Sequence, residues 1–466
     1  MQLYNSLTKK MEKFEPLNGM RVNLYVCGLT PYDHTHMGHA RTYAAFDMLR
    51  RYLALKGYEV FHIQNVTDVD DKILKRAKES KQDPRKLAGE FSAEASELFK
   101  KLNILEASAY PKVTGHIPEI IALVKKLVES GHAYETETGV YFEVKKFPEY
   151  GKLSGQKLDE ILAGSRKAVD ETKKNPEDFA LWKKTSGDAI EFDSPWGRGR
   201  PGWHIECSAM AGVYAKTLDI HGGARDLIFP HHENEIAQSE AAGAKPFVRF
   251  WLHTGFLTVS GEKMSKSLGN FVTLKDVLAQ HSPNAVRMFF AMAHYRSPID
   301  YNPEQIRQAE ATVGSIMNTL DSIDRALEER GKKKIKDIPL SNELKKKFLN
   351  FYHFVDLDFD IPTGITYVFS LMKSVNAHLS GDSLDYEALE YTKLEMGKVL
   401  EILGLVREKK QIPDKTCELL DLLVELRDSA RKKKDFKASD RIRDRLRQLG
   451  FVLEDGDDGR TRWKSL

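Results

Sequence analysis

Apolar and polar positions in the first part of the chain follow the pattern of a strand, a helix and a second strand. Residues 23–28 ("NLYVCG") alternate as strand residues do and end at a glycine, and residues 59–66 ("EVFHIQNV") predict the next strand. The segment between them, 38–57, reads as a helix closed by a glycine. A strand–helix–strand unit of this type is typical of a parallel sheet.

The pattern changes between residues 114 and 199. A helix at 117–131 runs into a hairpin-like segment at 133–144, and a polar, lysine-rich stretch follows. The apolar strand-and-helix pattern then resumes through "TLDIHGG" and "RFWLHTGFLTV". We therefore expect one α/β domain, interrupted by a smaller inserted domain, over roughly the first 300 residues.

From Pro303 onward the pattern is helical, with lysine runs that we interpret as solvated helix ends and loops. After "EKKQIPD", two further helical stretches at 417–434 and 438–450 precede the tail "FVLEDGDDGRTRWKSL". This tail predicts a β-hairpin around Asp458 and Gly459.

Composition says little about binding partners, but it argues against a membrane-spanning protein and against a secreted, disulfide-rich one. The chain has 466 residues, of which 41% are hydrophobic and 30% charged, with a net charge of +3. No stretch reaches the ~20 apolar residues of a spanning helix, and the first residues lack the apolar core of a signal peptide. Three widely separated cysteines argue against a disulfide framework. We expect a cytoplasmic protein that does not bind membranes.

The stretch "PHHENEIAQSEA" (residues 230–241) contains a candidate half of a metal site. His231 and Glu235 are four residues apart, which places them on one face of a helix. Cys207, in "GWHIECSAM", and Cys27, at the end of the first strand, are candidates for the other half. Thiolate, imidazole and carboxylate are the ligands that Zn²⁺ prefers.

Spacing alone leaves this assignment open. His232 fits as well as His231, and Glu233 as well as Glu235. Cys417 has no such neighbours, and we interpret it as a packing residue.

Two segments have the composition of phosphate-binding elements. "HTHMGHA" lies between the first strand and its helix, where free backbone N–H groups favour an anion; Gly38 permits close approach, and His36 and His39 can donate hydrogen bonds. Far downstream, "GEKMSKSLGN" carries Lys263 and Lys266 on a glycine-bounded loop. The pair predicts a nucleotide triphosphate held between a helix start and a closing loop.

These motifs carry a resemblance to a known family. "HMGH" resembles the HIGH motif of class I aminoacyl-tRNA synthetases, and "KMSKS" matches its partner motif. The longer strings "YVCGLTPYDHTHMGHART", "NVTDVDDKI", "GRPGWHIECSAM" and "DIHGGARDLIFPHHENEIAQSEA" are similar to the cysteinyl-tRNA synthetase family within this class. Met37 replaces the isoleucine of the HIGH motif, an apolar change of similar volume.

The resemblance implies a Rossmann-type α/β catalytic domain with an inserted connective peptide, a helical bundle and a small C-terminal α+β unit. The expected segments are the two catalytic halves (1–113 and 200–257), the connective peptide (114–199), the KMSKS loop with a stem-contact segment (258–310), the bundle (311–408) and an anticodon-binding unit (409–466).

The resemblance also implies the site residues. The family's zinc ligands fall on Cys27, Cys207, His231 and Glu235, and its substrate pocket falls on Thr67, Trp203 and Asp226. The implied reaction joins L-cysteine to ATP, with one Zn²⁺ per chain selecting the thiolate and Mg²⁺ accompanying ATP, and then transfers the cysteinyl group to tRNA(Cys). A monomer is expected.

Charge near the C-terminus agrees with an RNA partner. Residues 427–447 contain ten Lys and Arg against four Asp, and Arg460, Arg462 and Trp463 follow in the tail. Two rival hypotheses remain at this stage. One is a ligase that passes the same cysteinyl adenylate to a small amine, and the other is a non-catalytic, zinc-dependent RNA-binding module.

Overall fold

The computed structural model describes residues 1–156, 172–264, 269–330, 334–335, 341–407, 414–455 and 461–465. The chain divides into two compact units, Met1–Val406 and Arg407–Leu466. Within the described residues, no helix combines the length and the apolar character needed to cross a bilayer.

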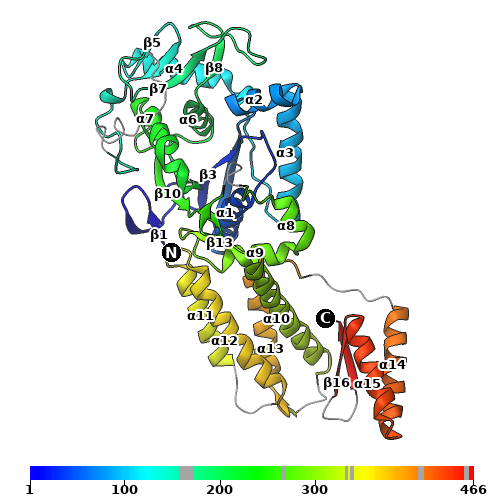
Figure 1. Cartoon of the computed structure of the whole chain (residues 1–466). Coiled ribbons are helices and arrows are strands. Elements are labelled where there is room, and N and C mark those ends of the chain that lie inside the picture. Colours follow the sequence, from blue (N-terminus) through cyan, green and yellow to red (C-terminus); the bar gives the residue numbers. More distant parts are fainter. Residues whose placement is uncertain are drawn as a thin grey trace. The chain divides into compact units, whose positions relative to one another are not determined.

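A four-stranded parallel sheet is the centre of the first unit, with strand order β10-β9-β3-β4 (Figure 1). Its strands are β3 (Arg21–Leu29), β4 (Glu59–Val66), β9 (Leu218–Ala224) and β10 (Val248–Thr254). The predicted strand–helix–strand unit is confirmed, because α1 (Met37–Leu55) joins β3 to β4. Helices α2 (Asp71–Ser80) and α3 (Pro84–Lys101) follow β4.

Alternate residues of β3 face different helices, as the twofold strand period requires. Leu24 and Val26 belong to the apolar core that includes α1. Tyr25 and Cys27 belong to a second core, which includes residues of α6 (Trp203–Tyr214) and α7 (Glu233–Ala241). The sheet is therefore covered on both faces, and Cys27 points toward α6 and α7.

The inserted region forms its own four-stranded antiparallel sheet, in the order β5-β6-β7-β8. The predicted hairpin is confirmed by the antiparallel β5–β6 pair. The elements of this region are α4 (Ile117–Glu129), β5 (Ala133–Glu135), β6 (Gly139–Phe142), β7 (Phe179–Lys184) and β8 (Gly199–Pro201). Helix α6 begins directly after β8 and returns the chain to the central sheet.

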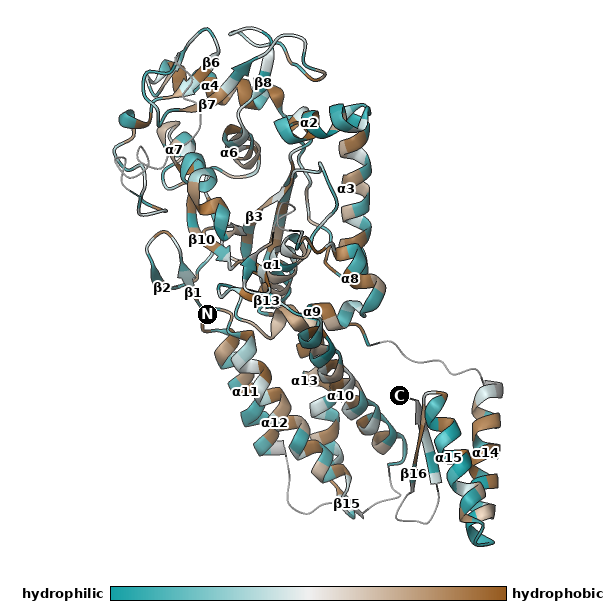
Figure 2. Ribbon diagram, viewed as in Figure 1, coloured by the Kyte–Doolittle hydropathy of each residue, from teal (hydrophilic) through white to brown (hydrophobic). Residues whose placement is uncertain are grey.

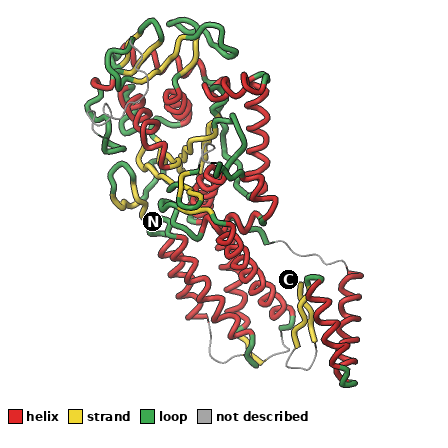
Figure 3. Tube along the Cα trace, in the orientation of Figure 1, coloured by secondary structure: helices red, strands yellow, loops and turns green. Residues whose placement is uncertain are grey.

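A small three-stranded sheet follows β10, and helices dominate the chain beyond it (Figure 3). The sheet and its flanking helices are β11 (Leu257–Val259), β12 (Glu262–Lys263), α8 (Leu274–Gln280), α9 (Pro283–Ala291) and β13 (Ile299–Tyr301). The helices of the bundle are α10 (Pro303–Glu328), α11 (Ser341–Val355), α12 (Ile361–Leu379) and α13 (Tyr386–Leu403). Two short pairs are β1 (Gln2–Asn5) with β2 (Lys10–Lys13), and β14 (Lys334–Ile335) with β15 (Ser383–Leu384).

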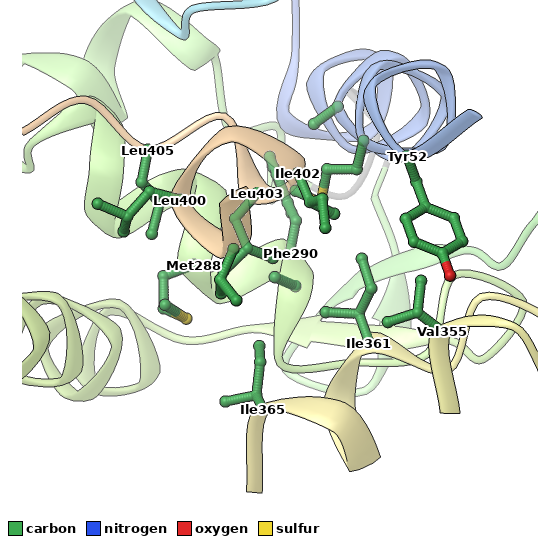
Figure 4. Close-up of a cluster of buried hydrophobic side chains, with 14 of the residues drawn as sticks. Tyr52, Met288, Phe290, Val355, Ile361, Ile365, Leu400, Ile402, Leu403 and Leu405 are labelled. Atoms are coloured by element: carbon green, nitrogen blue, oxygen red, sulfur yellow. The ribbon is translucent and has the colours of Figure 1, made fainter. Parts of the chain in front are cut away.

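The bundle shares one hydrophobic core with the central sheet. The helices of the bundle carry hydrophilic and hydrophobic residues along their length (Figure 2), and each helix contributes apolar residues to the buried core, among them Ile306, Leu344, Ile365 and Leu400. Figure 4 shows the junction, where Tyr52 of α1, Phe290 of α9, Ile361 of α12 and Leu403 of α13 lie together. Because this core is continuous, the bundle is part of the same unit as the sheet.

The second unit contains two helices and a hairpin. Its elements are α14 (Asp414–Lys432), α15 (Phe436–Gln448), β16 (Phe451–Asp455) and β17 (Thr461–Ser465). Strands β16 and β17 pair antiparallel, which confirms the predicted hairpin, although Asp458 and Gly459 lie outside the described residues. The α/β class with a helical region and a small α+β unit is as expected.

Candidate active site

Predicted site residues gather where the central strands end. Because β4 and β9 lie on opposite sides of β3, the winding of the sheet reverses between β3 and β9. Ligands of open α/β sheets bind at such a switch point, outside the carboxyl ends of the strands. Cys27 lies near the end of β3, Thr67 follows β4, and Asp226 follows β9.

Cys27, Cys207, His231 and Glu235 form a buried cluster at this edge. One donor atom from each lies within 4.8 Å of all the others. His231 Nε2 is 3.0 Å from Glu235 Oε1, as their spacing of four residues predicts. Two sulfurs, one imidazole and one carboxylate are a donor set that fits zinc.

The charges in the cluster also suit a cation. A hydrogen bond from Cys27 lowers the pKa of Cys207 to about 6, against the effect of burial. Burial raises the pKa of Glu235, but His221 and His231 outweigh it and hold the pKa at about 2. The cluster therefore carries two buried anionic groups at neutral pH. Burial lowers the pKa of His231, but Glu235 and Cys207 outweigh it and raise the pKa to about 10. His231 therefore holds a proton at neutral pH, and a metal ion would have to displace that proton to bind its Nε2.

The same pocket contains a second set of donors, so the choice between His231 and His232 is not made by distance alone. Cys27, His221, His232 and Glu235 also have donor atoms within 4.8 Å of one another. Cys27 Sγ is 3.2 Å from His232 Nε2. The His232 ring is held from its other side, with Nδ1 2.8 Å from His253 Nε2.

Glu233 has a different role from Glu235. Its carboxylate accepts hydrogen bonds from the backbone N–H groups of Gly151, Leu153 and Ser154, at 2.9, 3.1 and 2.8 Å. All three belong to the inserted region. Glu233 thus attaches this region to the first turn of α7, and it is not among the donors that could share an ion.

Replacing Glu233 with glutamine should therefore weaken the attachment and leave the candidate metal centre intact. The amide nitrogen would face at least one N–H donor, so we expect the free energy of unfolding to fall by about 1–3 kcal/mol. Urea denaturation and zinc content by emission spectrometry measure the two effects. Loss of zinc from a folded Glu233→Gln protein would contradict this division of roles.

Three histidines that were not predicted from the sequence surround the cluster. His204 Nδ1 is 3.0 Å from His231 Nδ1, and His221 Nε2 is 2.9 Å from Glu235 Oε2. His253 Nδ1 lies 2.8 Å from the Ser6 hydroxyl. Such outer groups orient metal ligands and fix their tautomers. The available signal was a histidine in each of "GWHIE", "DIHGG" and "WLHTG", next to apolar residues.

The three predicted pocket residues differ in their relation to the cluster. The ring of Trp203 lies 4.5 Å from that of His231 between centroids, and Trp203 is 38% exposed. Thr67 is buried, and its N–H donates to Leu29 O at 2.9 Å. Asp226 lies on an exposed turn, and no contact among the described residues joins it to the cluster.

His36 and His39 lie at the start of α1, as predicted for a phosphate site. His36 is the N-cap, and its Nδ1 accepts the His39 backbone N–H at 3.2 Å. The two rings are stacked with centroids 3.5 Å apart. A Cβ on Gly38 would lie 3.0 Å from the His36 ring, so any larger residue would push this ring by a few tenths of an ångström.

Both rings are neutral at pH 7. Burial lowers the pKa of His36 from 6.5 to about 4, and burial together with the neighbouring His36 lowers the pKa of His39 well below its ordinary value. Because Nδ1 of His36 accepts a hydrogen bond, its proton is on Nε2, which leaves that N–H as a donor. Because both pKa values are depressed in the folded state, the two neutral rings contribute stability that is fully present above pH ~6.5. This contribution to the free energy of unfolding is lost as the pH falls.

The segments flanking the KMSKS loop contact the HMGH segment. Met37 N–H donates to Val272 O at 3.1 Å, and Leu274 N–H donates to Thr35 O at 2.8 Å. The backbone of Lys263 belongs to β12, whereas its side chain and the whole of Lys266 lie outside the described residues. The residues that follow the KMSKS loop are thus adjacent to the start of α1.

Comparison with known proteins agrees with this arrangement. The family described as "tRNA synthetases class I (C) catalytic domain" matches residues 13–311. The solved structure of methionyl-tRNA synthetase from Mycobacterium tuberculosis, in complex with methionyl-adenylate, is similar with a TM-score of 0.64 at 18% identity, covering 87% of this chain and 94% of that one. The fold is that of a class I aminoacyl-tRNA synthetase.

Similarity over the full length narrows the class. A cysteine–tRNA ligase of Thermococcus onnurineus is 48% identical, covering 100% of this chain and 99% of that protein. One of Methanococcus maripaludis strain C6 is 46% identical, with coverage of 100% and 99%. The chain belongs to the cysteine–tRNA ligase family.

Proposed function

We propose that this chain joins L-cysteine to ATP, giving cysteinyl adenylate and pyrophosphate, and transfers the cysteinyl group to tRNA(Cys). One observation carries the proposal: four buried zinc-type donors lie at the switch point, beside the start of α1 that bears the candidate phosphate ligands. We assign the zinc ligands to Cys27, Cys207, His231 and Glu235, because this set contains both thiols of the pocket.

The metal would serve to select the amino acid. Serine differs from cysteine by one atom, and a pocket that relies on shape separates such analogues by only ~1–3 kcal/mol. Bound zinc supplies affinity for a thiolate, whereas a hydroxyl is a poor ligand at neutral pH. Trp203, Thr67 and Asp226 would bound the rest of the substrate pocket, with Trp203 covering the metal edge.

The protein's own groups would stabilise charge during adenylate formation. The cysteine carboxylate attacks the α-phosphorus, and pyrophosphate leaves. His36 and His39 would donate hydrogen bonds to phosphate oxygens, and Gly38 would let the nucleotide approach the backbone. Lys263 and Lys266 would neutralise the leaving pyrophosphate when their loop closes. Mg²⁺ would enter with ATP.

The remaining segments have proposed roles in binding tRNA. The basic residues of the second unit would contact the anticodon region, and residues 258–310 would contact the stem. The insertion at 114–199 would act as a connective peptide. We expect the protein to act as a monomer in the cytoplasm.

Two assays test this function in order. Exchange of labelled pyrophosphate into ATP should require cysteine, which would eliminate a purely RNA-binding role. Charging of a tRNA(Cys) transcript should then exceed any transfer to a small amine such as glucosamine. Exchange with efficient transfer to the amine and none to tRNA would contradict the proposal and favour the amine ligase.

A further inference from the structure

Arg41 is a buried arginine that binds carbonyl groups. It lies on α1, two residues after His39, and its side chain is 3% exposed. Its guanidinium donates to the backbone carbonyls of Gly255 at 2.8 Å, Phe256 at 2.6 Å, His294 at 3.5 Å, Tyr295 at 3.4 Å and Ser297. These carbonyls come from two separate segments of the chain.

The charge of Arg41 is balanced differently from that of other buried arginines. Arg51 and Arg287 each bind the Asp47 carboxylate, whereas Arg41 forms no ion pair within the described part of the chain. Burial lowers the pKa of Arg41 to about 10, so it remains charged at neutral pH. A buried charge needs hydrogen-bonded partners, and the converging carbonyl dipoles supply them here.

Two of these carbonyls, those of Gly255 and Phe256, lie at the junction between the central sheet and the β11–β12 hairpin, which leads into the KMSKS loop. Gly255 and Phe256 connect β10 to β11, and β11 pairs with β12, the strand that contains Lys263. The junction is tight, because a Cβ on Gly255 would lie 2.3 Å from Ser297 O. Arg41 therefore holds two closely packed backbones together at the root of the hairpin.

The far end of the KMSKS segment is attached to the same helix. Val272 and Thr35 take part in the backbone hydrogen bonds that join this end to the start of α1. Both attachments are thus made to the first turns of α1, which also carry the candidate phosphate ligands His36 and His39.

We propose that Arg41 is a positioning residue for adenylate formation, which holds the root of the β11–β12 hairpin in register with the phosphate-binding start of α1. This inference rests on the proposed nucleotide site. Arg41 contacts neither substrate nor metal in this role; it sets the position from which the KMSKS lysines reach the phosphates.

The test is Arg41→Lys in the full-length, zinc-loaded enzyme. Lysine keeps the charge but offers three donors on a compact head, so it cannot serve five carbonyls from two segments. We expect faster hydrogen–deuterium exchange of the amides in residues 257–264. We also expect kcat/KM for ATP in cysteine-dependent pyrophosphate exchange to fall by about 100-fold, because small misplacements of reacting groups are costly. The KM for cysteine should not change.

Arg51→Lys is the matched control, since Arg51 is a buried arginine of the same helix. Arg51→Lys should have a thermal stability comparable to that of Arg41→Lys. It should leave the hydrogen–deuterium exchange of residues 257–264 and the KM for ATP unchanged. If Arg41→Lys folds poorly, Gly255→Ala takes its place. It opens the same junction from the other side and should show the effects expected of Arg41→Lys. Unchanged exchange of residues 257–264 in both junction variants would overturn the proposal even in an active enzyme. If the wild-type protein shows no cysteine-dependent pyrophosphate exchange, the proposed function fails instead. The hydrogen–deuterium exchange of residues 257–264 still tests whether Arg41 holds the hairpin.

Discussion

Replacing Cys207 with serine should yield a folded protein that has lost the proposed zinc ion and most of its preference for cysteine over serine. Cys207 is 2% exposed and lies among Cys27, His231 and Glu235, so a hydroxyl there removes one of two soft ligands without adding volume. The remaining three donors bind zinc more weakly. We expect the ratio of cysteine to serine activation to fall to about 10- to 200-fold, which is the discrimination that the shape of a pocket provides.

Metal content and pyrophosphate exchange with each amino acid measure this effect. Cys417→Ser is the matched control, because Cys417 belongs to the second unit and is not among the grouped donors of the described residues. It should retain one zinc per chain and full discrimination. A zinc-free Cys207→Ser enzyme that still rejects serine would show that the metal does not select the substrate.

The ends of the sheet strands could be predicted from the sequence because short-range pattern determines them. The strand that ends near Cys27, the helix after it and the strand before Thr67 all follow from apolar periodicity and glycine positions. The i to i+4 relation of His231 and Glu235 also follows from local geometry.

Other parts of the site depend on contacts between distant segments. The exclusion of Glu233 depends on three N–H groups of an insertion about 80 residues earlier in the chain. Its adjacent sequence is as compatible with a ligand as that of Glu235. In the same way, Arg41 reads as an ordinary helix residue until two remote loops bring their carbonyls to it. Backbone acceptors have no sequence signature, which explains why arginines that bind them are not predicted.

The hydrogen bonds of His36 allow its structural and chemical roles to be separated, and this gives the second large prediction. His36 caps α1 through Nδ1, so its opposite Nε2–H is the group proposed to contact phosphate. Asparagine is a strong N-cap but does not place a donor where Nε2 lies. His36→Asn should therefore keep the helix start and lose the phosphate contact, whereas His36→Ala should lose both.

We expect both variants to slow pyrophosphate exchange by about 10²–10³-fold, the typical effect of removing one preorganised donor to a transition-state oxygen. Only His36→Ala should also lower the free energy of unfolding, by about 1 kcal/mol, because its cap is missing. Urea denaturation and exchange at saturating cysteine give the two quantities. Full activity in His36→Asn would reduce His36 to a helix cap. Near-equal stability of the two variants would instead mean that the His39 N–H finds another acceptor, and the assignment of the free Nε2 proton would lose its basis.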